Sequence, residues 1–131
     1  MATHRLSISV NDGSQAGVTP IEVTKTADGV LWADLVIADS VTDQETVFAM
    51  DFSALEYIYI HSDQTITIET NAADATGGQA ITITADVPFY WHKNSGITNP
   101  ITADIITNIF ITNASGSTAN ITIRGLQDST P

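Results

Sequence analysis

Hydrophobic and polar residues alternate with a period of two through the middle of the chain. Isoleucines occupy every second position within 58–60, 66–68 and 81–83, with tyrosine, threonine or glutamate around them. Because successive residues of a β-strand point to opposite faces, this alternation predicts strands with one apolar and one polar face. We expect 55–92 to form three or four consecutive strands, arranged as an antiparallel meander that buries its isoleucines.

Shorter alternating stretches on both sides of this meander predict further strands. Their ranges are 6–10, 18–25, 30–38, 45–51, 104–112 and 120–126. Pro20 suggests an edge position or a bulge for the second strand, because proline cannot donate to a ladder. Asp28-Gly29 predicts a tight hairpin between the second and third strands, since a type I′ turn needs positive φ at both central residues. The third strand has apolar residues on both faces, with Trp32 and Val36 opposite to Leu31 and Leu35, and is expected to be covered on both sides.

About nine short strands with turn signals at close intervals predict an all-β fold. We expect an antiparallel β-sandwich of a jelly-roll-like type. The irregular stretch 93–100 is expected to carry the chain from one sheet to the other. The sequence has no repeat of fixed period and no linker, so 1–131 is expected to form a single domain. A short flexible tail is expected at about 127–131.

The chain is strongly acidic, with a net charge of −11 from 15 Asp and Glu against 4 Lys and Arg. Such a surface repels phosphate backbones and anionic lipids, so we expect no binding of nucleic acid and no binding of membranes. No apolar run reaches membrane-spanning length. The first residues contain no apolar signal core, so we expect synthesis in the cytoplasm without a signal peptide.

The sequence lacks the motifs of catalytic and metal sites. There is no cysteine, which excludes disulfides and thiolate metal sites. The three histidines, His4, His61 and His92, lack the spacing of a metal motif, and no nucleophile elbow or phosphate-binding loop is present. We therefore expect no catalytic residues, no metal site, no cofactor and no enzymatic activity. A pair of carboxylates needs only proximity in space, so it stays open as an alternative.

Two further motif matches have ordinary structural explanations. The turn 11–14 could offer oxygen ligands to calcium, but Asx residues in turns usually bond their own backbone. Asn113-Ala114-Ser115 and Asn120-Ile121-Thr122 match the N-glycosylation triplet. In a chain without a signal peptide we expect these matches to be chance.

Outward aromatic residues are the most suggestive feature of the sequence. If Ile58 and Ile60 face the core, Tyr57 and Tyr59 face outward, and the meander places them beside Thr65, Thr67 and Glu69. In the stretch 89–92 we expect Phe89 and Trp91 to point inward, and Tyr90 and His92 outward. Outward tyrosines are typical of protein interfaces and of sugar-binding platforms. We predict a protein interface at Tyr57, Tyr59, Tyr90 and His92, with coverage by a second sheet or a long loop as the alternative.

Three stretches, Tyr59–Asn71, Pro88–His92 and Ile109–Asn113, resemble small β-sandwich virion structural proteins of tailed bacteriophages, which are often capsid decoration or cement proteins. The resemblance covers roughly 49–128 and lies in Thr/Ile strands, Asn/Gly loops, an acidic surface and the lack of cysteine. It implies a non-enzymatic virion structural protein that stabilises the phage head by binding at capsid-subunit junctions. The implied partners are the major capsid protein or other virion subunits, and further copies of the chain in a trimer or dimer. The implied location is the capsid surface of the virion.

A second function class fits the same residues. The outward tyrosines could form an open platform in a carbohydrate- or receptor-binding β-sandwich module of a tail fibre or an adhesin. An enzyme is the third alternative, and it would be revealed by turnover that a single Asp or Glu substitution abolishes.

Overall fold

A computed structural model of the chain describes residues 1–8, 21–51, 53–73, 78–102 and 105–128. Ten strands and no helix lie within these ranges. The strands are β1 (Ala2–Ile8), β2 (Ile21–Ala27), β3 (Gly29–Ile37), β4 (Val41–Asp51), β5 (Leu55–Ser62), β6 (Ile66–Thr70), β7 (Ala80–Ile83), β8 (Phe89–His92), β9 (Ile105–Asn113) and β10 (Ala119–Gln127).

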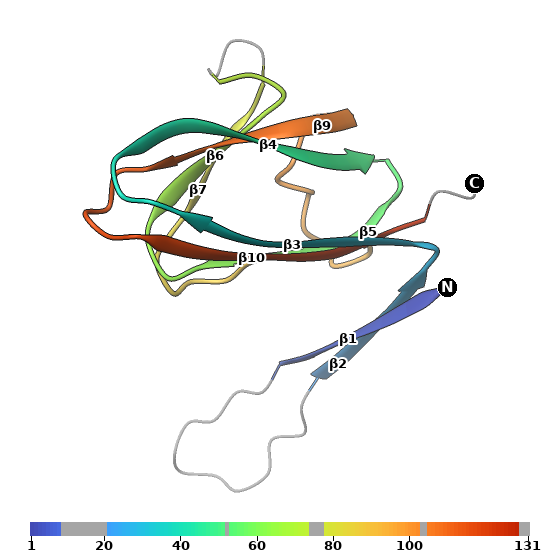
Figure 1. The fold of residues 1–131 in the computed structure, drawn as a ribbon. Helices are drawn as coiled ribbons and strands as arrows, with labels where there is room; N and C mark the ends of the chain where they lie inside the picture. The colour runs from blue at the N-terminus through green and yellow to red at the C-terminus, as the bar shows by residue number, and fades with distance from the viewer. Residues whose placement is uncertain (9–20, 52, 74–77, 103–104, 129–131) are drawn as a thin grey trace, which may run out of the picture.

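Strands β3 to β10 form two antiparallel sheets that face each other (Figure 1). The sheet with the order β3-β10-β5-β8 is called the tyrosine sheet below, and the sheet with the order β4-β9-β6-β7 is called the threonine sheet. From β3 onward the chain changes sheet at every connection except the one between β6 and β7. This is the strand order of an eight-stranded jelly roll. The predicted antiparallel β-sandwich is confirmed.

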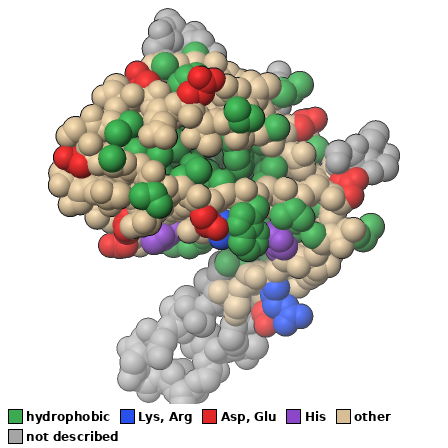
Figure 2. Space-filling model, in the orientation of Figure 1, with side chains coloured by type: hydrophobic (Ala, Val, Ile, Leu, Met, Phe, Trp, Pro, Cys, Tyr) green, Lys and Arg blue, Asp and Glu red, His purple; other side chains and the backbone are tan. Residues whose placement is uncertain are grey.

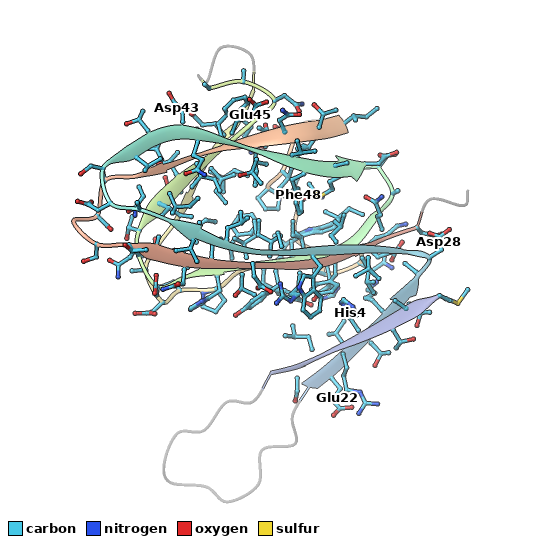
Figure 3. All side chains as sticks on the ribbon, viewed as in Figure 1. His4, Glu22, Asp28, Asp43, Glu45 and Phe48 are labelled. Carbon is cyan, nitrogen blue, oxygen red and sulfur yellow. The ribbon has the colours of Figure 1, made fainter. Side chains whose placement is uncertain are left out.

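The core lies between the two sheets and consists largely of isoleucines. Ile58 and Ile123 of the tyrosine sheet and Ile111 of the threonine sheet are almost fully buried. Phe48 points from β4 into the same space (Figure 3). β-branched side chains suit this arrangement, because they pack well on the pleated surface of a sheet. Each fully buried side chain of this size contributes about 1.5–3 kcal/mol relative to exposure.

The meander predicted over 55–92 is wrong. β5 and β6 lie in different sheets, as do β7 and β8, and only β6 pairs with its neighbour in sequence, β7. Both arrangements bury the same isoleucines, because alternation decides which face a residue takes and not which strand it pairs with. Tyr57 and Tyr59 therefore do not lie beside Thr65, Thr67 and Glu69, which belong to the other side of the sandwich. The crossing predicted for 93–100 is confirmed, since it joins β8 to β9 across the two sheets.

β1 and β2 form a separate antiparallel ribbon, with pairs from Ala2 and Ala27 to Ile8 and Ile21. The ribbon projects from the sandwich on the outer side of the tyrosine sheet (Figure 1). The hairpin predicted at Asp28-Gly29 is wrong: Gly29 begins β3 opposite Gln127 of β10, and its φ is not positive. Pro20 and the turn 11–14 lie outside the described residues.

Three further predictions, on the start of β4, the end of β10 and the outer face of β3, differ from the structure. β4 begins at Val41, four residues earlier than expected. Gln127 belongs to β10 and not to a tail, and the backbone N–H of Asp128 donates to the Ala54 carbonyl at 2.7 Å. The outer face of β3 is not covered, because the ribbon packs on β5 and β10 and leaves this edge strand open. Residues 129–131 lie outside the described part of the chain.

Asn113 is the polar side chain at the end of the core. It is fully buried at the last position of β9. Its Nδ2 donates to the carbonyls of Ile37, Ala38 and Ser117 at 3.1, 3.1 and 2.8 Å. The side chain therefore ties the turn between β3 and β4 to the turn between β9 and β10. The amide nitrogen of Asn113 is therefore not accessible in the folded protein.

Candidate functional site

The register of the tyrosine sheet aligns its outward side chains in rows across the four strands. One row of directly opposed residues contains Trp32, Arg124, Tyr59 and Tyr90, from β3 across β10 and β5 to β8. The next row contains Val30, Leu126, Tyr57 and His92. The four predicted interface residues thus share one face, and the expected orientations are confirmed, because Phe89 and Trp91 pack against the core. Their role as interface residues remains a prediction.

The aromatic side chains of this face contact one another. The ring centres of Tyr57 and Tyr90 are 6.0 Å apart, and those of Tyr90 and His92 are 5.7 Å apart. The Tyr59 and His61 rings are stacked, with centres 6.5 Å apart and planes inclined by 7°. These separations lie within the range at which aromatic pairs attract. The rings of this face therefore form two clusters, one of Tyr57, Tyr90 and His92 and one of Tyr59 and His61.

The ribbon covers one end of this face. His4 points from β1 toward the sandwich (Figure 3), and its Nδ1 is hydrogen-bonded to the Tyr57 hydroxyl at 3.3 Å. A small hollow beneath the ribbon is lined by His4, Leu6, Val23, Lys25, Tyr57 and Tyr90. Burial raises the pKa of both Tyr57 and Tyr90. The alternative of coverage by another segment therefore applies in part to these two tyrosines.

A half-buried ion-pair cluster fixes the ribbon to the sheet. Leu126 pairs with Tyr57 and Gln127 with Leu55, so Glu56 is the extra residue of a β-bulge in β5. Lys25 Nζ of the ribbon lies 3.5 Å from one Glu56 carboxylate oxygen, and Lys93 Nζ lies 2.6 Å from the other. Lys25 Nζ also donates to the Lys93 carbonyl at 2.9 Å. The bulge thus places a carboxylate where it holds two cations from separate parts of the chain.

The other end of the face is open and is dominated by Trp32. Its side chain is 63% exposed, while the guanidinium of Arg124 lies 3.5 Å from the ring centre. Arg124 Nη2 donates to both Asp34 carboxylate oxygens at 2.7 and 3.0 Å, and Trp32 Nε1 donates to Asp34 Oδ2 at 3.1 Å. The hydrogen bond from Arg124 holds the pKa of Asp34 below its ordinary value. Hydrophobic side chains gather in this part of the molecule, over β3 and β10 (Figure 2).

The sequence interpretation missed Trp32 as a surface residue because it expected β3 to be covered on both sides. The signal was present, since Trp32 and Val36 alternate with a second apolar set along one strand. That pattern fits a strand covered on both faces and also an edge strand with an exposed apolar face. Only the pairing of β3 in the sheet distinguishes these two arrangements, and β3 pairs with β10, which lies about ninety positions away in the sequence.

Charge is distributed unevenly between the two outer faces. All four cations of the chain, Arg5, Lys25, Lys93 and Arg124, lie on the ribbon or the tyrosine sheet or directly after β8, and each is within 4 Å of a carboxylate. The outer face of the threonine sheet carries Asp43, Glu45 and Glu69 and no lysine or arginine. Asp43 and Glu45 point away from the sandwich on β4 (Figure 3). The molecule therefore has one aromatic face with neutralised cations and a second face that carries carboxylates and threonines, with Val47 also exposed.

The described ranges contain neither a cluster of metal-binding side chains nor a membrane-spanning helix. Residues there include no group of three or more His, Asp or Glu side chains that could hold a metal ion. They also include no helix that is long and apolar enough to cross a membrane. Comparison with protein-family models, curated proteins and solved structures finds no match. The outer face of the tyrosine sheet is therefore the strongest candidate for a functional surface.

Proposed function

We propose that this chain is a non-enzymatic virion structural protein of the capsid decoration or cement type, which docks through the outer face of its tyrosine sheet. The observation that carries the proposal is the gathering of exposed apolar and aromatic side chains on the outer face of the tyrosine sheet. The docking face exposes Val30, Trp32 and Val36 by 48, 63 and 68%, and its cations are already paired within the molecule. Exposed apolar and aromatic side chains gathered on one face are typical of protein interfaces.

The face that carries the carboxylates suits the side that remains in water. Carboxylates are strongly hydrated and repel other acidic particles, so this face would keep decorated heads apart. Binding at junctions of symmetric capsid subunits would stabilise the shell by mass action, since the bound protein favours the assembled state. Jelly rolls recur in viral capsid and lectin domains, a likeness of fold that supports the proposal by analogy.

Co-sedimentation with empty heads tests the docking face. The heads are assembled from the major capsid protein that the same phage genome encodes. Wild-type protein is expected to bind them to saturation at a fixed ratio to the capsid subunit. T122R places a bulky cation at the centre of the tyrosine sheet and is expected to abolish binding, whereas T67R, the matched change on the threonine sheet, leaves it intact. Lack of wild-type binding, or equal binding of both variants, would overturn the proposal.

A carbohydrate-binding module is the second candidate, and the exposed indole of Trp32 favours it. Sugars stack on flat aromatic rings and bond to polar groups beside them, and Asp34 and Arg124 supply such groups here. Arg124 occupies one face of the ring, so a sugar would stack on the opposite face. Saturable binding on a glycan array that W32A abolishes, together with no binding to heads, would favour this function over docking.

A further inference from the structure

The outer edge of β3 is regular, long and open. β3 pairs with β10 over nine consecutive residues without a shift of register, and no described strand pairs with its other side. The other edge strands differ: β7 and β8 have four residues each, and β4 has two register shifts against β9. Short edges and bulges protect sheets against the addition of further strands. β3 has neither protection.

Both faces of β3 carry apolar side chains at this edge, and Asp34 is the charged residue of the outer face. Val30, Trp32 and Val36 are exposed on the outer face. Ala33 and Leu35 on the inner face pack against the core but remain only partly buried. A strand added beside β3 would therefore bury apolar side chains on both faces while it satisfies the open backbone groups.

We propose that the open β3 edges of two copies of this chain pair antiparallel about a two-fold axis, with Ala33 opposite the partner's Ala33. The two tyrosine sheets then become one continuous sheet. A self-complementary contact of this kind is the usual interface of a symmetric dimer. Each ribbon joins β3 at Gly29, so the antiparallel arrangement places the two ribbons at opposite ends of the seam.

Register and charge select this pairing. Directly opposed residues of an antiparallel pair point to the same face of the sheet. In a two-fold seam, one residue of β3 must therefore lie opposite its own copy in the partner, and this residue is the centre of the seam. Ala33 is the midpoint of β3, and this centre alone pairs all nine of its residues. It places Val30 opposite the partner's Val36 and Trp32 opposite the partner's Asp34. A seam centred on Asp34 would instead oppose two carboxylates, which is unfavourable.

This inference rests on the self-association that the resemblance to virion structural proteins implies, and not on binding to heads. The first experiment is thiol crosslinking of A33C, which carries the only thiol because the chain has no cysteine. Opposed Cβ atoms across such a seam lie about 4.5–5.5 Å apart, within reach of a short thiol crosslinker. A33C is expected to give a product of twice the mass in high yield. V47C, on the exposed outer face of β4, is the control and is expected to stay monomeric on a denaturing gel.

A pair of double variants tests the register without a thiol. V30K/V36K places like charges opposite each other twice in the seam, and it is expected to weaken the dimer at least about tenfold by sedimentation equilibrium. V30K/V36E places opposite charges at the same positions and is expected to dimerise more tightly than V30K/V36K. Circular dichroism confirms that both variants are folded.

The outcomes separate the seam from the wider proposal. A wild-type dimer in which A33C does not crosslink, or equal dissociation of the two double variants, would overturn the β3 seam and leave self-association standing. A monomer at every concentration would overturn both, and binding to heads would still be decided by co-sedimentation. A monomer whose A33C thiol crosslinks to the capsid protein would assign the edge to a different partner and overturn self-pairing.

Discussion

The guanidinium of Arg124 lies 3.5 Å from the centre of the Trp32 ring, on the strand beside it. The same guanidinium donates to both oxygens of Asp34, which in turn accepts a hydrogen bond from the indole. Each of the three side chains is thus held by the other two. An exposed ring that is fixed in this way loses little conformational freedom on binding, which suits a residue at the centre of a contact surface.

Arg124→Lys should loosen Trp32 while it keeps the positive charge. Lysine lacks the planar group that stacks on the ring and bonds two carboxylate oxygens. Loss of the ring contact is expected to lower the free energy of unfolding by about 0.5–1 kcal/mol, measured by urea denaturation. Arg5→Lys is the control, because Arg5 makes a single exposed contact with Glu22 at 3.7 Å. Equal stability of the two variants would contradict a structural role of the stack.

Alkaline pH should weaken the attachment of the ribbon. Burial raises the pKa of Tyr57 above its ordinary value of 10.0. The folded chain therefore keeps this proton while the unfolded chain loses it, so stability is fully present below pH 10.0 and falls as the pH rises through the higher folded value. A titration of tyrosinate absorbance should show a late component from Tyr57 and Tyr90, and Tyr57→Phe should reduce it. An unchanged titration in this variant would contradict the assignment.

Tyr59 and Tyr57 should respond differently to the same substitution. Tyr59 lies between Arg124 and Tyr90 in the open row, whereas Tyr57 is bonded to His4 beneath the ribbon. Tyr59→Asp is expected to leave the ribbon in place and to abolish docking to heads. Tyr57→Asp is expected to release the ribbon, seen as faster amide exchange in β1 and β2. Intact docking of the Tyr59 variant would exclude Tyr59 from the interface.

Local pattern was sufficient to predict the strands and their faces, but not their partners. The isoleucines at 58–60 and 66–68 alternate identically whether the chain turns back within one sheet or crosses to the facing one, so the short connection after Ser62 suggested a hairpin that does not exist. The outward orientation of Tyr59 and Tyr90 could be predicted, because the alternation of side chains along each strand alone decides it. The cover over Tyr57 could not, because it depends on how β2 leaves the sandwich at Asp28.

Asn113→Asp tests the polar contact that joins two turns of the sandwich. The substitution keeps the shape of the side chain but replaces the Nδ2 donor, so the carbonyls of Ile37, Ala38 and Ser117 face an oxygen instead. Because the side chain is fully buried, water cannot restore these bonds without opening the end of the core. A buried group left without its partner costs about 1–3 kcal/mol, so thermal and urea denaturation should show a loss of at least that size. Asn94→Asp, on the exposed turn after β8, is the control and is expected to stay within about 0.5 kcal/mol of the wild type. A similar small change for Asn113→Asp would mean that the two turns hold their positions without this side chain.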